Sequence, residues 1–110
     1  MYPKGGTIVE NEIDQLTNLF GLLADKTRVN ILMVLVAGER NVTSLCEQLA
    51  LPQPTVSHHL GLLRVNNVIA NRRRGKQVFY ALNTAVKASD GQSLEIAIEN
   101  FSVRIARSST

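Results

Sequence analysis

The sequence feature that most constrains the fold is the stretch from Pro52 to Asn66, PQPTVSHHLGLLRVN. Its apolar residues recur at helical spacing. At 100° per residue, one face of this helix carries bulky, mostly apolar side chains: Val56, His59, Leu60 and Leu63. The opposite face carries small or polar residues and no carboxylate: Pro54, Ser57, His58 and Gly61, with Arg64 at its edge. Such a slim polar face suits a helix that enters a groove of duplex DNA, and an amphipathic surface helix without that role is the alternative.

A short helix is predicted directly before this stretch. Thr43 suits the N-cap of a helix that runs to about Ala50, and Ser44 with Glu47 offers an alternative capping box. A tight turn over residues 51–53 follows, and Pro54 suits the first turn of the next helix. A short helix, a turn of three or four residues and a longer helix form a helix-turn-helix, which the sequence predicts over residues 43–66.

After Asn67 the apolar pattern changes to a period of two. Residues 68–72 and 77–82 are predicted as two strands, joined by a turn that contains Arg73, Arg74, Gly75 and Lys76. Like charges crowded at the tip of a hairpin repel one another, so a nearby anion would stabilise this one. A basic tip that protects an exposed sheet edge is the alternative.

Charge is distributed unevenly along the chain. Residues 48–89 contain six Lys or Arg and no Asp or Glu, whereas the remaining residues contain six Lys or Arg against nine Asp or Glu. A segment of charge +6 is therefore embedded in a chain whose other residues sum to −3. A local positive field of this kind favours a polyanion as partner. A membrane surface is not expected, because no basic amphipathic helix carries Trp or Phe on its apolar side.

Three further helices are expected over residues 11–23, 26–37 and 93–107, after a flexible arm at residues 1–10. Asp25 suits the N-cap of the second of them, and Gly38 suits the residue after its end. Both terminal helices leave an apolar stripe that a 110-residue monomer has little core to cover, and pairing with a second copy would bury both. The residues predicted at this dimer interface are Ile13, Leu16, Phe20, Leu94, Ile98, Phe101 and Ile105.

The segment from about Leu23 to Asn83 resembles the winged-helix core of the ArsR/SmtB-type bacterial transcriptional repressors. The resemblance rests on three motifs in the right order: LADKTRVNIL, the PTVSHHL helix, and a Gly-Lys wing that ends in VFYAL. It implies a single, mostly α domain with a small β-hairpin, a winged helix-turn-helix whose wing spans residues 67–83 and whose last element is a helix. It also implies a homodimer that binds a double-stranded operator and represses transcription.

The resemblance assigns DNA contacts to the helix after the turn and to the wing, and the chemistry of the residues agrees. Gln53 and His58 carry groups that hydrogen-bond purine edges, whereas Arg and Lys on the wing supply salt-dependent affinity with little sequence preference. His59 lies on the apolar side of its helix, so we expect it to be packed inside rather than to read bases. The predicted DNA-binding residues are Gln53, Thr55, Ser57, His58, Arg64, Arg72, Arg73, Arg74 and Lys76.

Many members of the family release DNA when they bind a metal, but this sequence departs from both known ligand patterns. The Cys-x-Cys positions hold Asn41 and Thr43, and the C-terminal positions hold Thr84, Val86, Ala97 and Asn100. Because zinc needs three or four His, Cys or carboxylate ligands, we expect no metal site and no cofactor. Cys46 shares a face with Val42 and Leu45, which favours a buried thiol; a redox-responsive repressor that uses Cys46 is the alternative.

Other function classes receive less support. An enzyme is not expected, because the sequence has neither a Gly-rich phosphate loop nor a recognisable nucleophile and base. A winged-helix module that binds proteins and does not read DNA remains an alternative, although it would need neither the acid-free segment nor the arginine-rich wing. The single cysteine and the absence of a signal peptide or a long apolar run favour a cytoplasmic protein.

Overall fold

The computed structural model describes residues 10–89 and 91–108, and within them the chain forms four helices and six strands. The helices are α1 (Glu10–Leu23), α2 (Lys26–Val36), α3 (Val42–Leu49) and α4 (Gln53–Val65). The strands are β1 (Arg40–Asn41), β2 (Ile69–Arg74), β3 (Gln77–Leu82), β4 (Val86–Ser89), β5 (Ser93–Ile98) and β6 (Phe101–Ala106). The predicted arm at residues 1–10 lies outside the described residues, except that Glu10 already belongs to α1.

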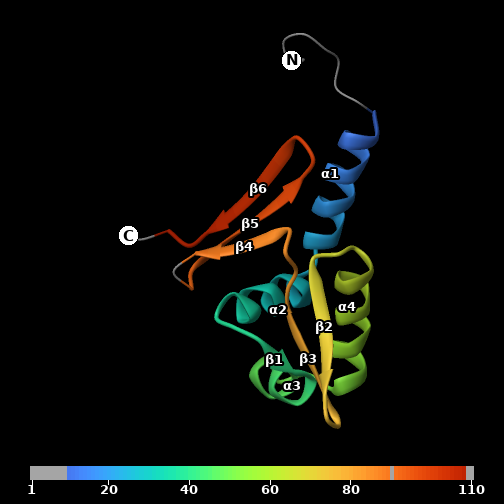
Figure 1. Cartoon of the computed structure of the whole chain (residues 1–110), viewed down its shortest axis with the longest axis vertical. Helices are drawn as coiled ribbons and strands as arrows, with labels where there is room; N and C mark the ends of the chain where they lie inside the picture. Colours follow the sequence, from blue (N-terminus) through green and yellow to red (C-terminus); the bar gives the residue numbers. More distant parts are fainter. Residues whose placement is uncertain (1–9, 90, 109–110) are drawn as a thin grey trace.

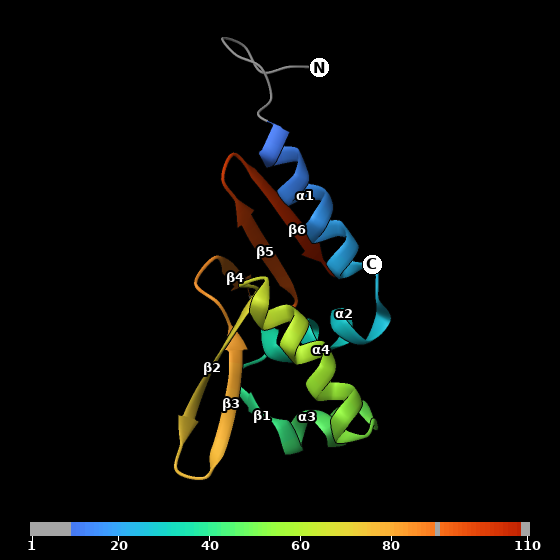
Figure 2. The same ribbon diagram turned by 90° about the vertical axis from the view of Figure 1, so that its right-hand side faces the viewer.

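The elements gather at two ends of the molecule (Figure 1). Helices α2, α3 and α4 lie at one end with a sheet of order β1-β3-β2, and α1 lies at the other end with a sheet of order β4-β5-β6. Figure 2 shows that the β2–β3 hairpin extends toward the same end of the molecule as α3. The helix-turn-helix and the hairpin are therefore presented together, away from α1.

The helix-turn-helix is fixed by a shared apolar core. The predicted inner face of α4 is confirmed, because three of its four residues are buried: Val56, Leu60 and Leu63. They belong to the same core as the fully buried Ile31 and Leu32 of α2 and Leu45 of α3. Complete burial of one such side chain contributes about 1.5–3 kcal/mol, so the angle between α3 and α4 is held by packing rather than by the turn.

Side-chain N-caps stabilise the first turns of two helices around this core, α2 and α3. Asp25 caps α2 as predicted, and its carboxylate accepts a hydrogen bond from the amide of Arg28 at 3.1 Å. The cap predicted for α3 is wrong: Asn41, not Thr43, accepts the bond from the amide of Ser44, at 2.8 Å. Asn41 also ends the short strand β1, whose extended backbone gives it the conformation that an N-cap requires.

The predicted hairpin forms, with its boundary shifted. Arg74 pairs with Gln77, so only Gly75 and Lys76 make the turn, and Gly75 has the positive φ of 62° that tight hairpin turns favour. Arg73 and Arg74 lie in β2 rather than in the turn. Alternate residues of a strand point to opposite faces, so the three arginines of β2 do not share one face.

The predicted helix over residues 93–107 is wrong, because this segment forms β5 and β6. Residues 94, 98, 101 and 105 have helical spacing, but the apolar side chains also alternate along each half of the segment. In the β5–β6 register Leu94 faces Ile105 and Ile96 faces Val103, so the two strands share one apolar face. A turn at Glu99–Asn100 and β-branched side chains favour this hairpin over a helix.

Candidate nucleic-acid interface

Helix α4 presents its predicted polar face to solvent. Gln53, Thr55, His58 and Arg64 are exposed, and Ser57 is half-buried. Pro52 occupies the N-cap without a side-chain hydrogen bond to the helix, so the amides of Gln53 and Thr55 in the first turn have no side-chain cap; Pro54 between them has no N–H. The N-terminus of a helix attracts anions through such amides and through its dipole. The start of α4 is therefore suited to a phosphate as well as to base edges.

A groove of about 320 Å³ joins α4 to the wing, which we define as the β2–β3 hairpin, residues 69–82. Gln53 and Ser57 of α4 line one side, and the Gln53 amide donates to the Ser57 hydroxyl at 2.8 Å. Lys76 and Gln77 line the wing side, and Thr43 of α3 contributes from the third element. Two of the predicted contact residues of α4 thus lie close to the predicted cation of the wing tip.

Glu39 binds two of the wing arginines. The Arg72 Nε and Nη2 atoms donate to Glu39 Oε2 and Oε1 at 2.8 and 3.1 Å, and Arg74 donates to Oε1. Arg74 also lies over the ring of Phe79, 4.3 Å from its centroid. The hydrogen bond from Arg72, followed by the charges of Arg72 and Arg74, lowers the pKa of Glu39. The hydrogen bond to Glu39 and the negative charge of that carboxylate raise the pKa of Arg72. DNA phosphates would have to compete with Glu39 for these two guanidinium groups.

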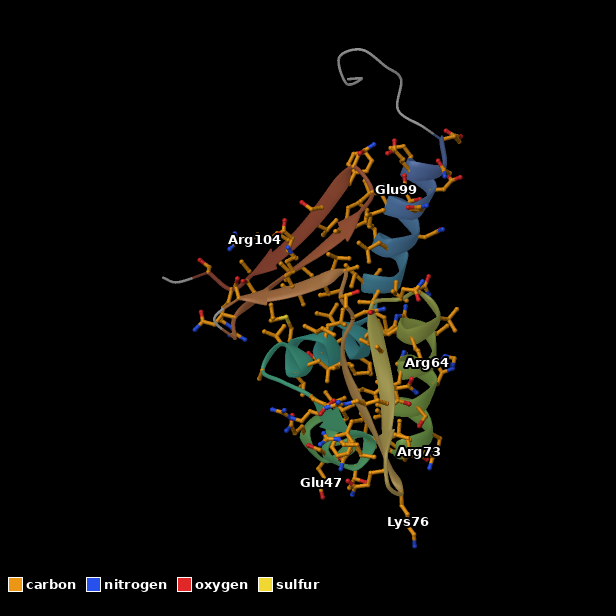
Figure 3. The ribbon with its side chains drawn as sticks, in the orientation of Figure 1. Glu47, Arg64, Arg73, Lys76, Glu99 and Arg104 are labelled. Carbon is orange, nitrogen blue, oxygen red and sulfur yellow. The ribbon has the colours of Figure 1, made fainter. Side chains whose placement is uncertain are left out.

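The other cations of the site have no carboxylate partner like Glu39 among the described residues. Within residues 10–89 and 91–108, Arg64, Arg73 and Lys76 form no ion pair, and all three are exposed. Figure 3 shows them at the end of the molecule that carries α4 and the wing, distant from Arg104 on β6. The acid-free segment therefore leaves three unpaired positive charges along α4 and the wing.

His59 is packed inside, as predicted. Its Nδ1 atom lies 3.3 Å from the guanidinium of Arg28, whose Nε donates to the carbonyl of Leu22 at 2.7 Å. Asp25 lies 3.9 Å from the same histidine nitrogen. The pKa of Asp25 is lowered, first by the hydrogen bond from the Arg28 amide and then by the charges of His59 and Arg28. Arg28 thus links the end of α1, the start of α2 and the inner face of α4.

The residues expected at a dimer interface have unequal exposure. Phe20 is 50% exposed on α1, whereas Leu94 is 1% exposed and belongs to the core of the chain itself. The others are half-buried: Ile13, Leu16, Ile98, Phe101 and Ile105. An apolar surface therefore remains along α1 and β6.

Cys46 is half-buried rather than fully buried, and its side chain packs against the core. Among the described residues, no group of three or more His, Cys, Asp or Glu side chains is arranged to hold a metal ion. No helix within this described part has the length and apolar character needed to cross a membrane.

Sequence reasoning missed Glu39. It lies before the acid-free segment and 33 residues from Arg72, so charge counting along the chain assigned it to the acidic remainder. Only the pairing of β1 with β3 brings it to the wing, since Arg40 faces Tyr80 in that register. A two-residue strand gives no periodic signal by which this contact could have been found.

Comparison with known proteins agrees with this fold. Residues 25–69 match the family model described as "Bacterial regulatory protein, arsR family". The HTH-type transcriptional regulator KmtR of Mycobacterium tuberculosis is 37% identical over 84 residues, which cover 74% of this chain and 65% of KmtR, just under two thirds. The transcriptional repressor SdpR of Bacillus subtilis is 35% identical over 71 residues, which cover 64% of this chain and 79% of SdpR.

Solved structures are similar over the same region. HlyU from Vibrio cholerae matches with a TM-score of 0.66 and 30% identity, over 69% of this chain and 83% of HlyU. Mb0332 from Mycobacterium bovis, described as a homodimeric winged helix-turn-helix DNA-binding domain, matches with a TM-score of 0.63 and 26% identity, over 73% of this chain and 75% of that one. The fold that these proteins share with the chain is the winged helix-turn-helix.

Proposed function

Because the chain belongs to the ArsR family of bacterial regulatory proteins, we propose that it represses transcription as a homodimer bound to a pseudo-palindromic operator. Family membership makes it a DNA-binding transcriptional regulator and not an enzyme. The observation that carries the proposal is the set of unpaired cations, Arg64, Arg73 and Lys76, along α4 and the wing. A winged helix that bound only proteins would have no need of them.

The proposal gives the two elements different tasks. Helix α4 lies in the major groove, where Gln53 and His58 hydrogen-bond base edges and Thr55 and Ser57 contact bases or nearby phosphates. Arg64, Arg73 and Lys76 bind phosphates and set the affinity for any duplex. Arg72 and Arg74 join them only where the duplex displaces Glu39.

Two arguments support the homodimer. A helix-turn-helix that reads a twofold-symmetric site does so as a twofold-symmetric dimer. Mb0332, whose fold this chain shares, is described as homodimeric. The apolar surface along α1 and β6 would supply the contact. A bacterial operator lies in the cytoplasm, which we propose as the place of action.

DNA binding by this chain is further proposed to be independent of metal. The positions that hold metal ligands in the family carry Asn, Thr, Val and Ala, which are poor ligands for zinc. The operator affinity measured with a chelator should equal the affinity measured with added zinc or arsenite. A large loss of operator affinity on addition of either zinc or arsenite would contradict this part of the proposal.

The experiment that tests the whole proposal is a selection of bound duplexes from a random pool, followed by a salt titration of the winning sequence. The selected sites should be inverted repeats. If the dimer contacts six or more phosphates, its affinity should fall by about 10³ or more between 50 and 200 mM salt. A purified protein that was monomeric and bound no duplex at low salt would overturn the proposal.

A further inference from the structure

The C-terminal sheet ends in an open edge. β6 pairs only with β5 among the described elements, and none of them lies beyond it in the ribbon (Figure 1). The strand, FSVRIA, has six residues, no proline and one charge, Arg104. Proteins usually protect such an edge with Pro, several charges or a covering loop, because its free N–H and C=O groups attract another strand. Within residues 10–89 and 91–108, β6 has none of these protections, so its outer edge is open to a partner strand.

The backbone of β6 determines which residues face that partner. The amide of Arg107 donates to the carbonyl of Gln92 at 3.1 Å, which continues the β5–β6 ladder. Hydrogen bonding alternates along an antiparallel strand, so the other odd-numbered residues of β6 also bond to β5. The even-numbered residues direct their N–H and C=O groups to the open side: Ser102, Arg104 and Ala106.

The side chains make the edge apolar on one face and polar on the other. Phe101, Val103 and Ile105 are half-buried on the face that they share with the buried Ile96. The opposite face of β6 carries Ser102, Arg104 and Ala106, all exposed. A strand added at this edge must therefore place apolar residues on the first face and tolerate a cation on the second.

We propose that this partner is β6 of a second copy of the chain, paired antiparallel about a twofold axis at Val103. Val103 then faces Val103 of the partner subunit, and Phe101 faces the partner's Ile105. Arg104 faces the partner's Ser102, so the two arginines do not oppose one another. The two three-stranded sheets become one sheet of six strands, in place of the helix pairing that the sequence predicts for residues 93–107.

Other registers of the same pair are worse. A shift of one residue would place apolar side chains opposite polar ones on both faces. A shift by two residues in one direction would put Arg104 opposite its own copy, where like charges repel. A shift by two in the other direction would leave Ile105 without an apolar partner across the axis. The self-complementary register at Val103 is what identifies the occupant of the edge as a second copy.

Disulfide trapping tests this register. Cys46 is the only cysteine, so the Cys46→Ser protein provides a clean background. In the proposed pair, the two Val103 Cα atoms would lie about 4.5 Å apart, within the range that a disulfide spans. Val103→Cys should therefore form a covalent dimer when reductant is removed. Ser102→Cys is the matched control and should stay uncrosslinked, because residue 102 faces residue 104 of the partner.

A proline at the open edge tests the same contact without a cysteine. The Ser102 N–H points outward, so Ser102→Pro removes a hydrogen bond to the partner strand and none to β5. This variant should keep its circular dichroism spectrum and become monomeric by light scattering, whereas Ala97→Ser on the outer face of β5 should remain dimeric.

The inference rests on the proposed homodimer, and these experiments separate the two. A Ser102→Pro protein that stays dimeric, together with a Val103→Cys protein that does not crosslink, would overturn the strand pairing and leave the homodimer standing. Crosslinking of the Ser102→Cys protein in place of the Val103→Cys protein would overturn the register. A Val103→Cys protein that crosslinks while the wild-type chain binds no duplex would retain the strand pairing and end the proposed function.

Discussion

Glu39 pairs with two of the three wing arginines, Arg72 and Arg74, and leaves Arg73 without an acid partner among the described residues. In the sequence, RRRGK is one continuous run of positive charge, but in the fold its arginines lie on two faces of β2. Arg72 and Arg74 lie on the face of β2 that Glu39 reaches, and Arg73 lies on the opposite face. Charge counts along a chain treat neighbouring residues as equivalent, but the alternation of a strand separates them.

Arg73→Ala should weaken binding to every duplex by a similar factor. Arg73 is exposed and has no acid partner among the described residues, so its charge is free to bind a phosphate. The slope of log affinity against log salt should become shallower by roughly 1 for each protomer. Lys87→Ala provides the control, because Lys87 belongs to the same acid-free segment but lies on β4. Unchanged binding to non-specific DNA by Arg73→Ala would contradict the role given to the wing.

Gln53→Ala should act differently, since a base contact carries sequence information. The variant should lose about 1–3 kcal/mol of discrimination at particular base pairs of the selected operator while its affinity for random DNA changes little. A set of single-base variants of the operator, titrated with both proteins, provides the measurement. A uniform loss across all of these duplexes would assign Gln53 to the phosphates instead.

Glu39→Gln should strengthen binding to non-specific DNA. The change releases Arg72 and Arg74 while it keeps the size of the side chain. Two further phosphate contacts per protomer would steepen the salt slope by up to roughly 1.8. Glu47→Gln removes an equal charge from α3 without releasing an arginine, so its effect should be smaller. Equal effects of the two variants would show that only net charge matters.

At the scale of elements, the sequence was sufficient to predict a helix or a strand where its apolar residues follow a single period. α4 has a single apolar face, and its core residues were predicted correctly from spacing alone. Residues 93–107 satisfy two periods at once, because Leu94, Ile98 and Phe101 fit a helix while Leu94, Ile96 and Ile98 fit a strand. What decides between them is tertiary: β4 supplies a pairing partner for β5, and β4 itself was not predicted.

The start of α3 allows a stability measurement that shows which residue caps this helix. Asn41 accepts the hydrogen bond from the Ser44 amide, whereas Thr43 lies inside the helix and is exposed. Asn41→Ala should cost about 1 kcal/mol, because the amide loses its acceptor. In thermal unfolding this corresponds to a decrease in Tm of roughly 4 °C. Thr43→Ala should leave Tm nearly unchanged, and the reverse order would restore Thr43 as the cap.

At the scale of the whole molecule, a dimer fixes the distance and the rotation between its two α4 helices. In the selected operator, the two half-sites should lie about one helical turn apart, so that both face the same side of the duplex. Inserting about five base pairs between them turns the second half-site to the far side. The affinity should then fall to that of a single half-site. Inserting about ten base pairs restores the face but lengthens the span by about 34 Å, so the affinity should stay low.

The same insertions placed outside the operator serve as controls and should change nothing. Ser102→Pro adds the decisive comparison, because a monomer binds each half-site independently. Its affinity for the half-site should match that of the wild-type chain, and it should be insensitive to the spacing. Neither α4 nor the wing packs extensively against β6 in the described part of the chain, so Ser102→Pro should leave both elements in place. A spacing preference that survived in a monomeric variant would therefore have to come from the DNA itself. That result would show that dimerisation does not contribute to sequence specificity and that each winged helix recognises its half-site independently.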